Sequence, residues 1–161
     1  MISAAYAAGL FDGEGGVAIS GTKQTGTGRT NHRLAHVRWT KRIYIGNTHR
    51  GVLEMMAETF GGTIVLWKVS ADRSHHRPFF MWNIYGEAAR GFLLAIRPHL
   101  IVKQQQVDIW LEFMDTMAPR SSPGFKPRLP EGTAERRLEL YAALLALNGR
   151  PRLQKGVDRL R

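Results

Sequence analysis

The chain has 161 residues, of which 43% are hydrophobic and 9% aromatic, enough to build one ordinary globular core. Its 23 lysines and arginines exceed its 13 acids, and the resulting net charge of +10, with a pI near 10.7, favours a polyanionic partner such as nucleic acid or an acidic membrane surface. Because the chain has no cysteine, disulfides and thiolate metal sites are excluded, and a metal would have to bind oxygen or imidazole ligands.

No membrane segment is predicted. No apolar run approaches the roughly 20 residues that a transmembrane helix needs. The opening MISAAYAAGLFDGEGG also lacks the basic start of a secretory signal. We therefore expect a soluble, intracellular protein without a membrane partner, in a bacterial or phage cytoplasm or in an organelle.

The first part of the chain is predicted to form one helix and two strands. The residues from Ile2 to Phe11 are mostly alanine, leucine and aromatic residues, which favour a helix that ends at the glycine cluster after it. From Val17 to Gln24 and from Arg33 to Ile45, apolar and polar residues alternate with a period of two, which predicts half-buried strands. The polar face of the second strand is unusually basic.

The remaining chain is predicted to add a helix, two strands and three further helices. The next helix ends with Phe60 at a glycine pair, and Asn47 or Thr48 is its expected N-cap. The later elements are, in order, strands 63–70 and 79–85, helices of about 87–96 and 102–117, a Pro-, Ser- and Gly-rich linker at 119–130, an amphipathic helix through Leu147 and a basic tail.

This order predicts an α+β fold in which helices cover one face of a four-stranded antiparallel sheet. The other face would hold the polar side chains of the strands, and it is the candidate surface for nucleic acid. The residues predicted on it are Ser20, Thr22, Gln24, Arg38, Arg42 and Lys68.

The segment AAGLFDGEG at residues 7–15 has the clearest chemistry. Ala8 and Gly9 have almost no side chain, so two copies of this helix can approach until their backbones nearly touch. Glu14 would then meet its symmetry mate. Two carboxylates on one axis repel each other unless cations lie between them, and such hard oxygen ligands suit Mg²⁺. The plainer interpretation is a core helix with a glycine-rich exit turn and solvated acids.

This segment resembles the LAGLIDADG signature of the homing endonucleases, in their single-motif, homodimeric form. Two later segments are similar to the same family: IYIGNT followed by VLEMMAETFGGTI, and RPHLIVKQQQ, in which a lysine follows a proline-broken helix. The resemblance implies an αββαββα core at residues 1–118 with a saddle-shaped four-stranded antiparallel sheet. Residues 119–161 would add a linker, a C-terminal helix and a basic tail packed on the same domain.

The resemblance also assigns roles to residues. Glu14 stands at the position of the metal-binding acid, and the carbonyl of Gly13 would bind the same Mg²⁺, for which Mn²⁺ or Ca²⁺ can substitute in binding. Asn47 and Lys103 look like the polar residue and the lysine at the edge of the family's active site. Helix capping by Asn47 and a solvated Lys103 remain open, and Arg50 is a weaker candidate for a second cation near the phosphate.

Ala8, Gly9 and Asp12 are the residues expected at the contact between two subunits, Ala8 and Gly9 because of their small size. Asp12 lies inside the last helical turn, so we expect it to support the helix end or the dimer and not to bind metal. Adjacent histidines in a loop point apart, so His75 and His76 are expected to contact DNA or to be solvated.

The expected partner is double-stranded DNA, bound by a homodimer over a long pseudo-palindromic site and cut in both strands across the minor groove, with short 3′ overhangs as in the family. Polar side chains on the strands would read bases, and cations would bind phosphates. The residues expected to contact DNA are Ser20, Thr22, Gln24, Arg29, Arg33, Arg38, Thr40, Arg42, Lys68, Arg73, His75 and Arg77.

Two other classes of function remain open. The first is a non-cutting nucleic-acid-binding protein on the same scaffold, either an intron RNA maturase or a DNA-binding regulator. Retention of Glu14, Asn47 and Lys103 together argues against it, although maturase activity can coexist with cleavage. The second is a basic structural RNA-binding protein such as a ribosomal component, which leaves the small-residue helix and its paired acids unexplained.

Overall fold

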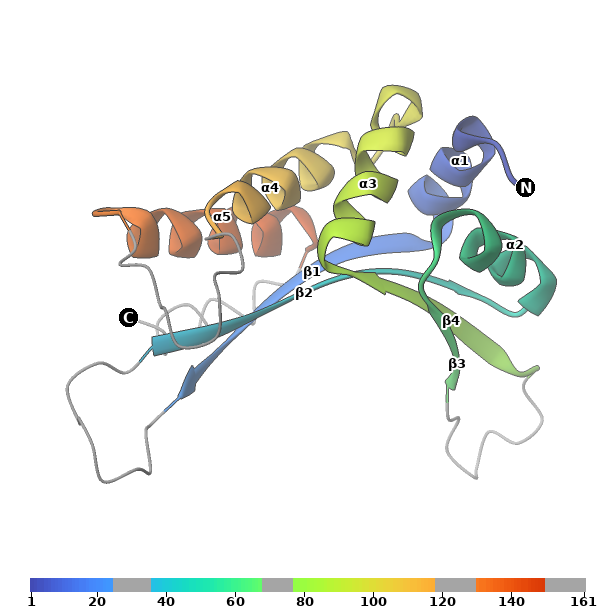
Figure 1. Ribbon diagram of the computed structural model, residues 1–161, viewed down its shortest axis with the longest axis horizontal. Coiled ribbons are helices and arrows are strands. Elements are labelled where there is room, and N and C mark those ends of the chain that lie inside the picture. Colours follow the sequence, from blue (N-terminus) through green and yellow to red (C-terminus); the bar gives the residue numbers. More distant parts are fainter. Residues whose placement is uncertain (25–35, 68–76, 118–129, 150–161) are drawn as a thin grey trace. The chain divides into compact units, whose positions relative to one another are not determined.

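The computed structural model describes residues 1–24, 36–67, 77–117 and 130–149 (Figure 1). Its elements are, in chain order, α1 (Ala4–Glu14), β1 (Gly15–Gln24), β2 (His36–Asn47), α2 (Arg50–Phe60), β3 (Thr63–Trp67), β4 (Phe79–Tyr85), α3 (Gly86–Ile96), the short 3-10 helix η2 (Arg97–His99), α4 (Gln104–Asp115) and α5 (Thr133–Leu147). The predicted α+β class and the αββαββα order with further C-terminal helices are confirmed. The predicted linker and basic tail lie almost wholly outside the described residues.

The chain divides into two compact units. One comprises Met1–Ala18 and Lys41–Val107, and the other Ile19–Thr40 and Asp108–Arg161. The division of the chain into a core at 1–118 and an appended segment at 119–161 stays a prediction. None of the helices in the described part of the chain is long and apolar enough to span a membrane.

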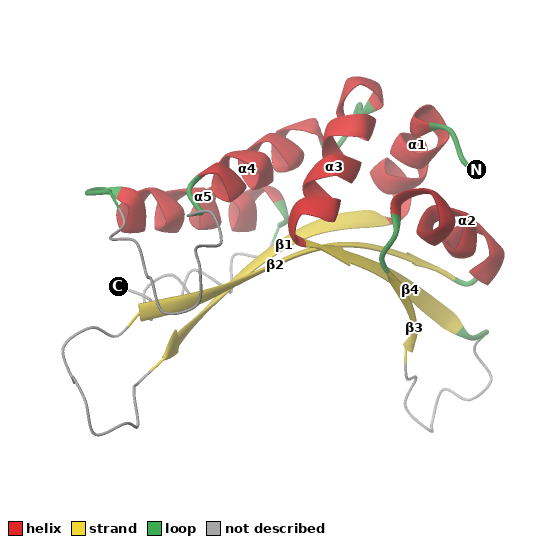
Figure 2. Cartoon of the chain, viewed as in Figure 1, coloured by secondary structure: helices red, strands yellow, loops and turns green. Residues whose placement is uncertain are grey.

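The strands form one antiparallel sheet in the order β1-β2-β4-β3 (Figure 2). In the antiparallel pair of β2 and β4, Ile43 lies opposite Ile84 and Ile45 opposite Trp82. β3 pairs antiparallel with the other edge of β4, where Ile64 also lies opposite Trp82. Since side chains alternate between the two faces of a strand, this register gathers the apolar residues of the central strands on one face.

The core of the first unit lies between that face and helices α1, α2 and α3. Phe92 of α3 is its centre, with edge-to-face ring contacts to Phe11 of α1 at 5.8 Å, Phe60 of α2 at 5.0 Å and Trp82 of β4 at 5.1 Å. The indole N–H of the buried Trp82 donates to the carbonyl of Gly61, at 2.8 Å. Burial of each such ring stabilises the fold by about 1.5–3 kcal/mol, so Phe92 ties three helices to the sheet.

The second unit has its own aromatic contacts. Trp39 of β2 meets Phe113 of α4 at 5.2 Å and Tyr141 of α5 at 5.5 Å. Arg137 of α5 is buried, and its guanidinium donates to the hydroxyl of Thr116, at 3.0 Å, and to the Thr116 carbonyl. Burial lowers the pKa of this arginine. These contacts tie α5 to the end of α4.

Several predicted boundaries differ from the structure, and two of the differences affect the candidate site. α1 continues through Gly13 to Glu14. The helix ends at Gly15, whose N–H donates to the Phe11 carbonyl. β2 extends through Asn47, which pairs with Phe80, so Asn47 does not cap α2. The N-cap is His49, whose Nδ1 accepts from the N–H of Val52 at 3.3 Å.

Candidate functional site

The C-terminal end of α1 places an exposed carboxylate at the junction of helix and sheet. Glu14 is the last residue of α1, and β1 begins at the next residue. A side chain at Gly15 would stand 2.3 Å from the ring of Phe11 and 2.7 Å from its carbonyl, so only glycine permits this direct exit. The carboxylate of Glu14 is thereby held where the backbone passes from α1 to β1.

Asp12 anchors the segment that leads into α4. One carboxylate oxygen accepts from the N–H groups of Ile101 and Val102, at 2.7 and 3.2 Å, and the other from that of Lys103, at 2.9 Å. Burial raises the pKa of Asp12, but these three donors and the charge of Lys103 outweigh it, so the pKa lies below its usual 3.8. Asp12 is therefore a charged anchor at the entrance to α4.

Lys103 makes the reciprocal contact with α1. Its Nζ donates to the carbonyl of Phe11, at 3.1 Å, and to that of Asp12. A cation at the C-terminal end of a helix is stabilised by the helix dipole and by the free carbonyls there. Burial lowers the pKa of Lys103, while the charges of Asp12 and Glu14 oppose that shift. The structure thus brings Lys103 within electrostatic range of Glu14.

The other proposed active-site residues lie at the turn between β2 and α2. The side-chain carbonyl of Asn47 accepts from the N–H of His49 at 2.8 Å, which is a local turn contact. Arg50 forms an ion pair with Glu54 at 2.8 Å, and its guanidinium lies 5.7 Å from the ring centre of Phe80. Both side chains therefore have structural partners in the unbound chain, and the catalytic role of Asn47 stays a prediction.

The residues predicted for the dimer contact differ in exposure. Ala8 has no exposed surface and packs inside the chain, and Asp12 binds the backbone before α4. Gly9 is exposed, and so are Ala5 and Gly13, which lie about one helical turn before and after it. The small-residue face of α1 that a second copy can reach is therefore Ala5, Gly9 and Gly13, and Ala8 does not belong to it.

The predicted DNA-contacting residues fall into three groups. Ser20, Thr22, Arg38, Thr40 and Arg77 are exposed, and Arg42 is half-buried with its guanidinium 5.0 Å from the ring centre of Tyr44. The side chain of Gln24 is not described. Arg29, Arg33, Lys68, Arg73 and His75, like His76, lie outside the described residues.

The Asp12 anchor yields a prediction with a defined pH dependence. Asp12→Asn should lower the free energy of unfolding by about 2 kcal/mol at pH 7, because three N–H groups lose a charged acceptor. The folded-state pKa lies below the unfolded one, so this contribution is complete above pH ~4 and is lost as the pH falls through the folded-state value. Urea unfolding at pH 7, 5 and 3 measures it.

The control for this test is Glu58→Gln, which changes an exposed carboxylate on α2. It should leave the free energy of unfolding almost unchanged at all three pH values. A difference between wild type and Asp12→Asn that stays constant from pH 7 to pH 3 would contradict the anchoring role.

Comparison with family models and with curated proteins found no match. Solved structures do match. The chain is similar to the LAGLIDADG homing endonuclease I-SmaMI bound to cleaved DNA, with a TM-score of 0.66 and 15% identity over 89% of this chain and 44% of that one. For the homing endonuclease I-CvuI in complex with its target, the TM-score is 0.62 and the identity 16%, over 89% of this chain and 80% of that one.

A third similar structure is an archaeal intron-encoded homing endonuclease, I-Vdi141I, complexed with DNA. It has a TM-score of 0.62 and 18% identity, over 98% of this chain and 95% of that one. At identities this low, the likeness establishes the fold.

Proposed function

We propose that this chain, which has the fold of the LAGLIDADG homing endonucleases, is a site-specific endonuclease that binds duplex DNA as a homodimer and hydrolyses both strands with divalent metal ions. One observation carries the proposal. Glu14 is an exposed carboxylate at the C-terminal end of α1, within electrostatic range of Lys103 and on a helix with an exposed small-residue face. A two-fold nuclease site can be built from these three parts: the acid, the ammonium group and the small-residue face of α1.

The dimer is supported by glycines that the single chain does not need. A side chain at Gly9 or Gly13 would meet nothing within 4 Å in the described structure. Glycine inside a helix costs about 1 kcal/mol relative to alanine, so these two residues weaken α1 without any benefit to the subunit itself. Close approach of a second copy of α1 is the benefit that we infer.

The lengths of the similar chains agree with two copies. I-SmaMI is matched over only 44% of its length by 89% of this chain, so one I-SmaMI chain is about twice as long as this one. Two copies of this chain would supply the same mass of protein as one chain of I-SmaMI. This arithmetic supports a homodimer.

The donor set suits a hard divalent cation. Glu14 offers carboxylate oxygens and Gly13 a carbonyl oxygen, both ligands that Mg²⁺ prefers. Among the residues that the structure describes, no group of three or more His, Asp or Glu side chains is placed to hold a metal. The second Glu14 and the DNA phosphates would supply the remaining oxygens. A bound metal would polarise the phosphoryl oxygen and lower the pKa of an attacking water.

The neighbouring residues would position the reactants. The ammonium group of Lys103, held at the end of α1, would order water and counter the charge that develops on the phosphate. Asn47, at the end of β2, would provide a polar contact at the edge of the site once DNA displaces its turn contact.

The sheet strands would bind the duplex. Ser20 and Thr22 on β1 and Arg38 and Thr40 on β2 are exposed at alternating positions, as residues on one strand face are. In a homodimer each set occurs twice, so the target would be long and pseudo-palindromic. Arginines would bind phosphates, and hydroxyl groups would read base edges in the major groove.

Selection of cleaved sites from a random duplex library with Mg²⁺ tests the function. We expect one family of long pseudo-palindromic sites cut in both strands. If Arg38, Arg42, Lys68 and Arg73 of both subunits bind phosphates, the slope of log K against log salt concentration should be about −7. Bound but uncut sites would indicate a non-cutting regulator, preference for intron RNA would indicate a maturase, and absence of duplex binding would contradict the proposal.

A further inference from the structure

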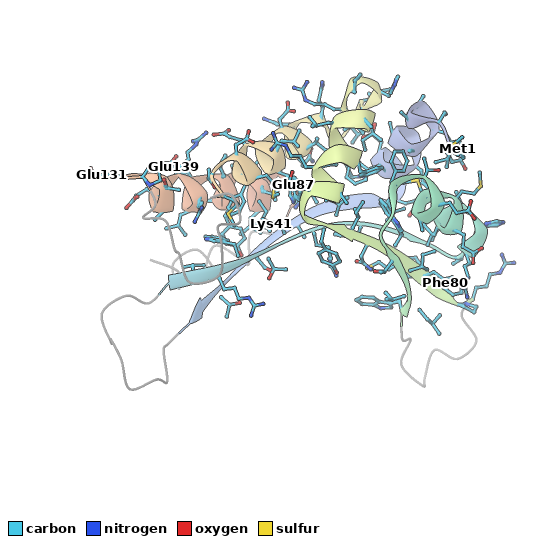
Figure 3. The ribbon with its side chains drawn as sticks, viewed as in Figure 1. Met1, Lys41, Phe80, Glu87, Glu131 and Glu139 are labelled. Atoms are coloured by element: carbon cyan, nitrogen blue, oxygen red, sulfur yellow. The ribbon has the colours of Figure 1, made fainter. Side chains whose placement is uncertain are left out.

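The sheet face opposite the helices has an apolar part in the first unit. On β4, Trp82 and Ile84 are buried under the helices, and Arg50 of α2 lies over Phe80, so the even-numbered side chains of β4 lie on the helix side (Figure 3). The alternating residues Phe79 and Met81 therefore lie on the open face.

The register of β3 extends this apolar surface. Val65 lies opposite Met81, and Trp67 lies opposite Phe79, so these four side chains share the open face. We call Val65, Trp67, Phe79 and Met81 the apolar patch. Val65 is 46% exposed and Trp67 51% exposed, which leaves about half of each side chain free to contact a ligand.

A glycine in β2 makes room for one ring of the apolar patch. Gly46 pairs with Met81, and a side chain at Gly46 would stand 2.3 Å from the ring of Phe79. The ring of Phe79 therefore lies across β2 at the point where the strand has no side chain. An apolar surface of this kind can contact methyl groups. It offers few hydrogen bonds, since the only polar group among the four side chains of the apolar patch is the indole N–H of Trp67.

The charges around the apolar patch favour a polyanion. On the same open face, Arg42 lies opposite Tyr85 and its guanidinium stacks on Tyr44. Arg77, two residues before Phe79 in the sequence, is exposed. The apolar group that a polyanionic duplex presents in its major groove is the methyl of thymine.

We propose that the apolar patch recognises thymine methyl groups, so that this half of the sheet selects A·T base pairs in the target by apolar contact. This inference rests on the proposed DNA-binding function and adds a specificity determinant to it. Hydrogen-bonding residues on β1 and β2 would read other positions. A target should therefore contain thymine at the base pairs that face β3 and β4.

Replacing thymine with deoxyuridine throughout a selected duplex tests the proposal, since this change removes only the methyl groups. Binding is measured with Ca²⁺, which prevents cleavage from confusing the result. Wild-type protein should bind the uracil duplex more weakly, by about fourfold for each contacted methyl. Equal affinity for the two duplexes would overturn the inference while leaving the endonuclease proposal intact. Absence of any selected duplex would overturn both.

Variants of the apolar patch test whether its side chains cause the preference for the thymine duplex. Val65→Ala combined with Trp67→Ala should have a smaller preference for the thymine duplex than wild type, because only Phe79 and Met81 of the apolar patch remain. Trp67→Phe, which keeps an apolar ring, should retain the preference. Leu66→Ala is the matched control, because Leu66 is 59% exposed on the same strand and points to the other face. It should retain the full preference. A double variant that still prefers thymine as strongly as wild type would show that the methyl groups are read elsewhere.

Discussion

Glu14→Gln should lose metal-dependent cleavage of both DNA strands while retaining DNA binding. Glutamine has nearly the same size and one carbonyl oxygen, but it lacks the charge that would balance a divalent cation. Loss of several kcal/mol of transition-state stabilisation corresponds to a rate lower by roughly a hundred- to a thousandfold or more. The rate of nicking of a selected duplex with Mg²⁺ measures the effect, and binding with Ca²⁺ is measured in parallel.

The control is Glu58→Gln, which removes an exposed carboxylate on α2. Cleavage by this variant should remain within about twofold of wild type, since an exposed charge away from the site contributes little. If Glu14→Gln cut DNA at the rate of Glu58→Gln, the assignment of the metal-binding acid would be wrong.

Gly9→Leu should abolish double-strand cleavage by separating the two subunits. Within one chain a Cβ atom at residue 9 meets nothing within 4 Å, and leucine is a better helix former than glycine, so the subunit should fold at least as well. At the proposed dimer contact two leucines would overpack the interface, at about 1–3 kcal/mol each, which weakens dimerisation by roughly 30- to 20,000-fold. Sedimentation at several concentrations measures the dissociation constant.

Gly91→Leu makes the same change on α3, where a side chain also meets nothing within 4 Å. This variant should have the wild-type dissociation constant and cleave normally. Equal dimerisation by Gly9→Leu and Gly91→Leu would contradict the placement of the contact on α1.

The order of helices and strands follows from periodicity in the sequence, because each element buries one face. β4 was predicted with its exact bounds, since its alternating residues pack Trp82 and Ile84 under the helices. The helix boundaries were less predictable. Gly13 suggests an early end to α1, yet the C-cap is Gly15, because only there does the chain pass close to Phe11.

The candidate site was predicted only in part. The sequence motif pointed to Glu14 and Lys103, and the structure places the two within electrostatic range. The contacts of Asp12 with three N–H groups before α4 could not be predicted from the sequence, because they join residues about 90 positions apart. A charged residue near the end of an otherwise apolar helix was the available signal.

The exposed faces were the least predictable feature. Ala8 was expected at the dimer contact from its small size, but whether a small residue faces the core or a partner depends on the rotation of the helix, which packing around Phe92 decides.

The open face of β3 and β4 was expected to be polar. This face contains Val65 and Trp67. Both stay about half exposed because β3 is an edge strand and has a neighbouring strand on one side only.

Disulfide cross-linking of a Gly9→Cys variant tests the close pairing of two α1 helices most directly. The chain has no cysteine of its own, so any disulfide must join two subunits. Symmetry-related cysteines on helices in close contact have Cα atoms within the roughly 4–7 Å that a disulfide spans. We predict a cross-linked dimer under mild oxidation, while Gly91→Cys on α3 stays monomeric in the same assay. A Gly9→Cys protein that cleaves DNA yet forms no more disulfide than Gly91→Cys would contradict the two-fold arrangement of the glutamates.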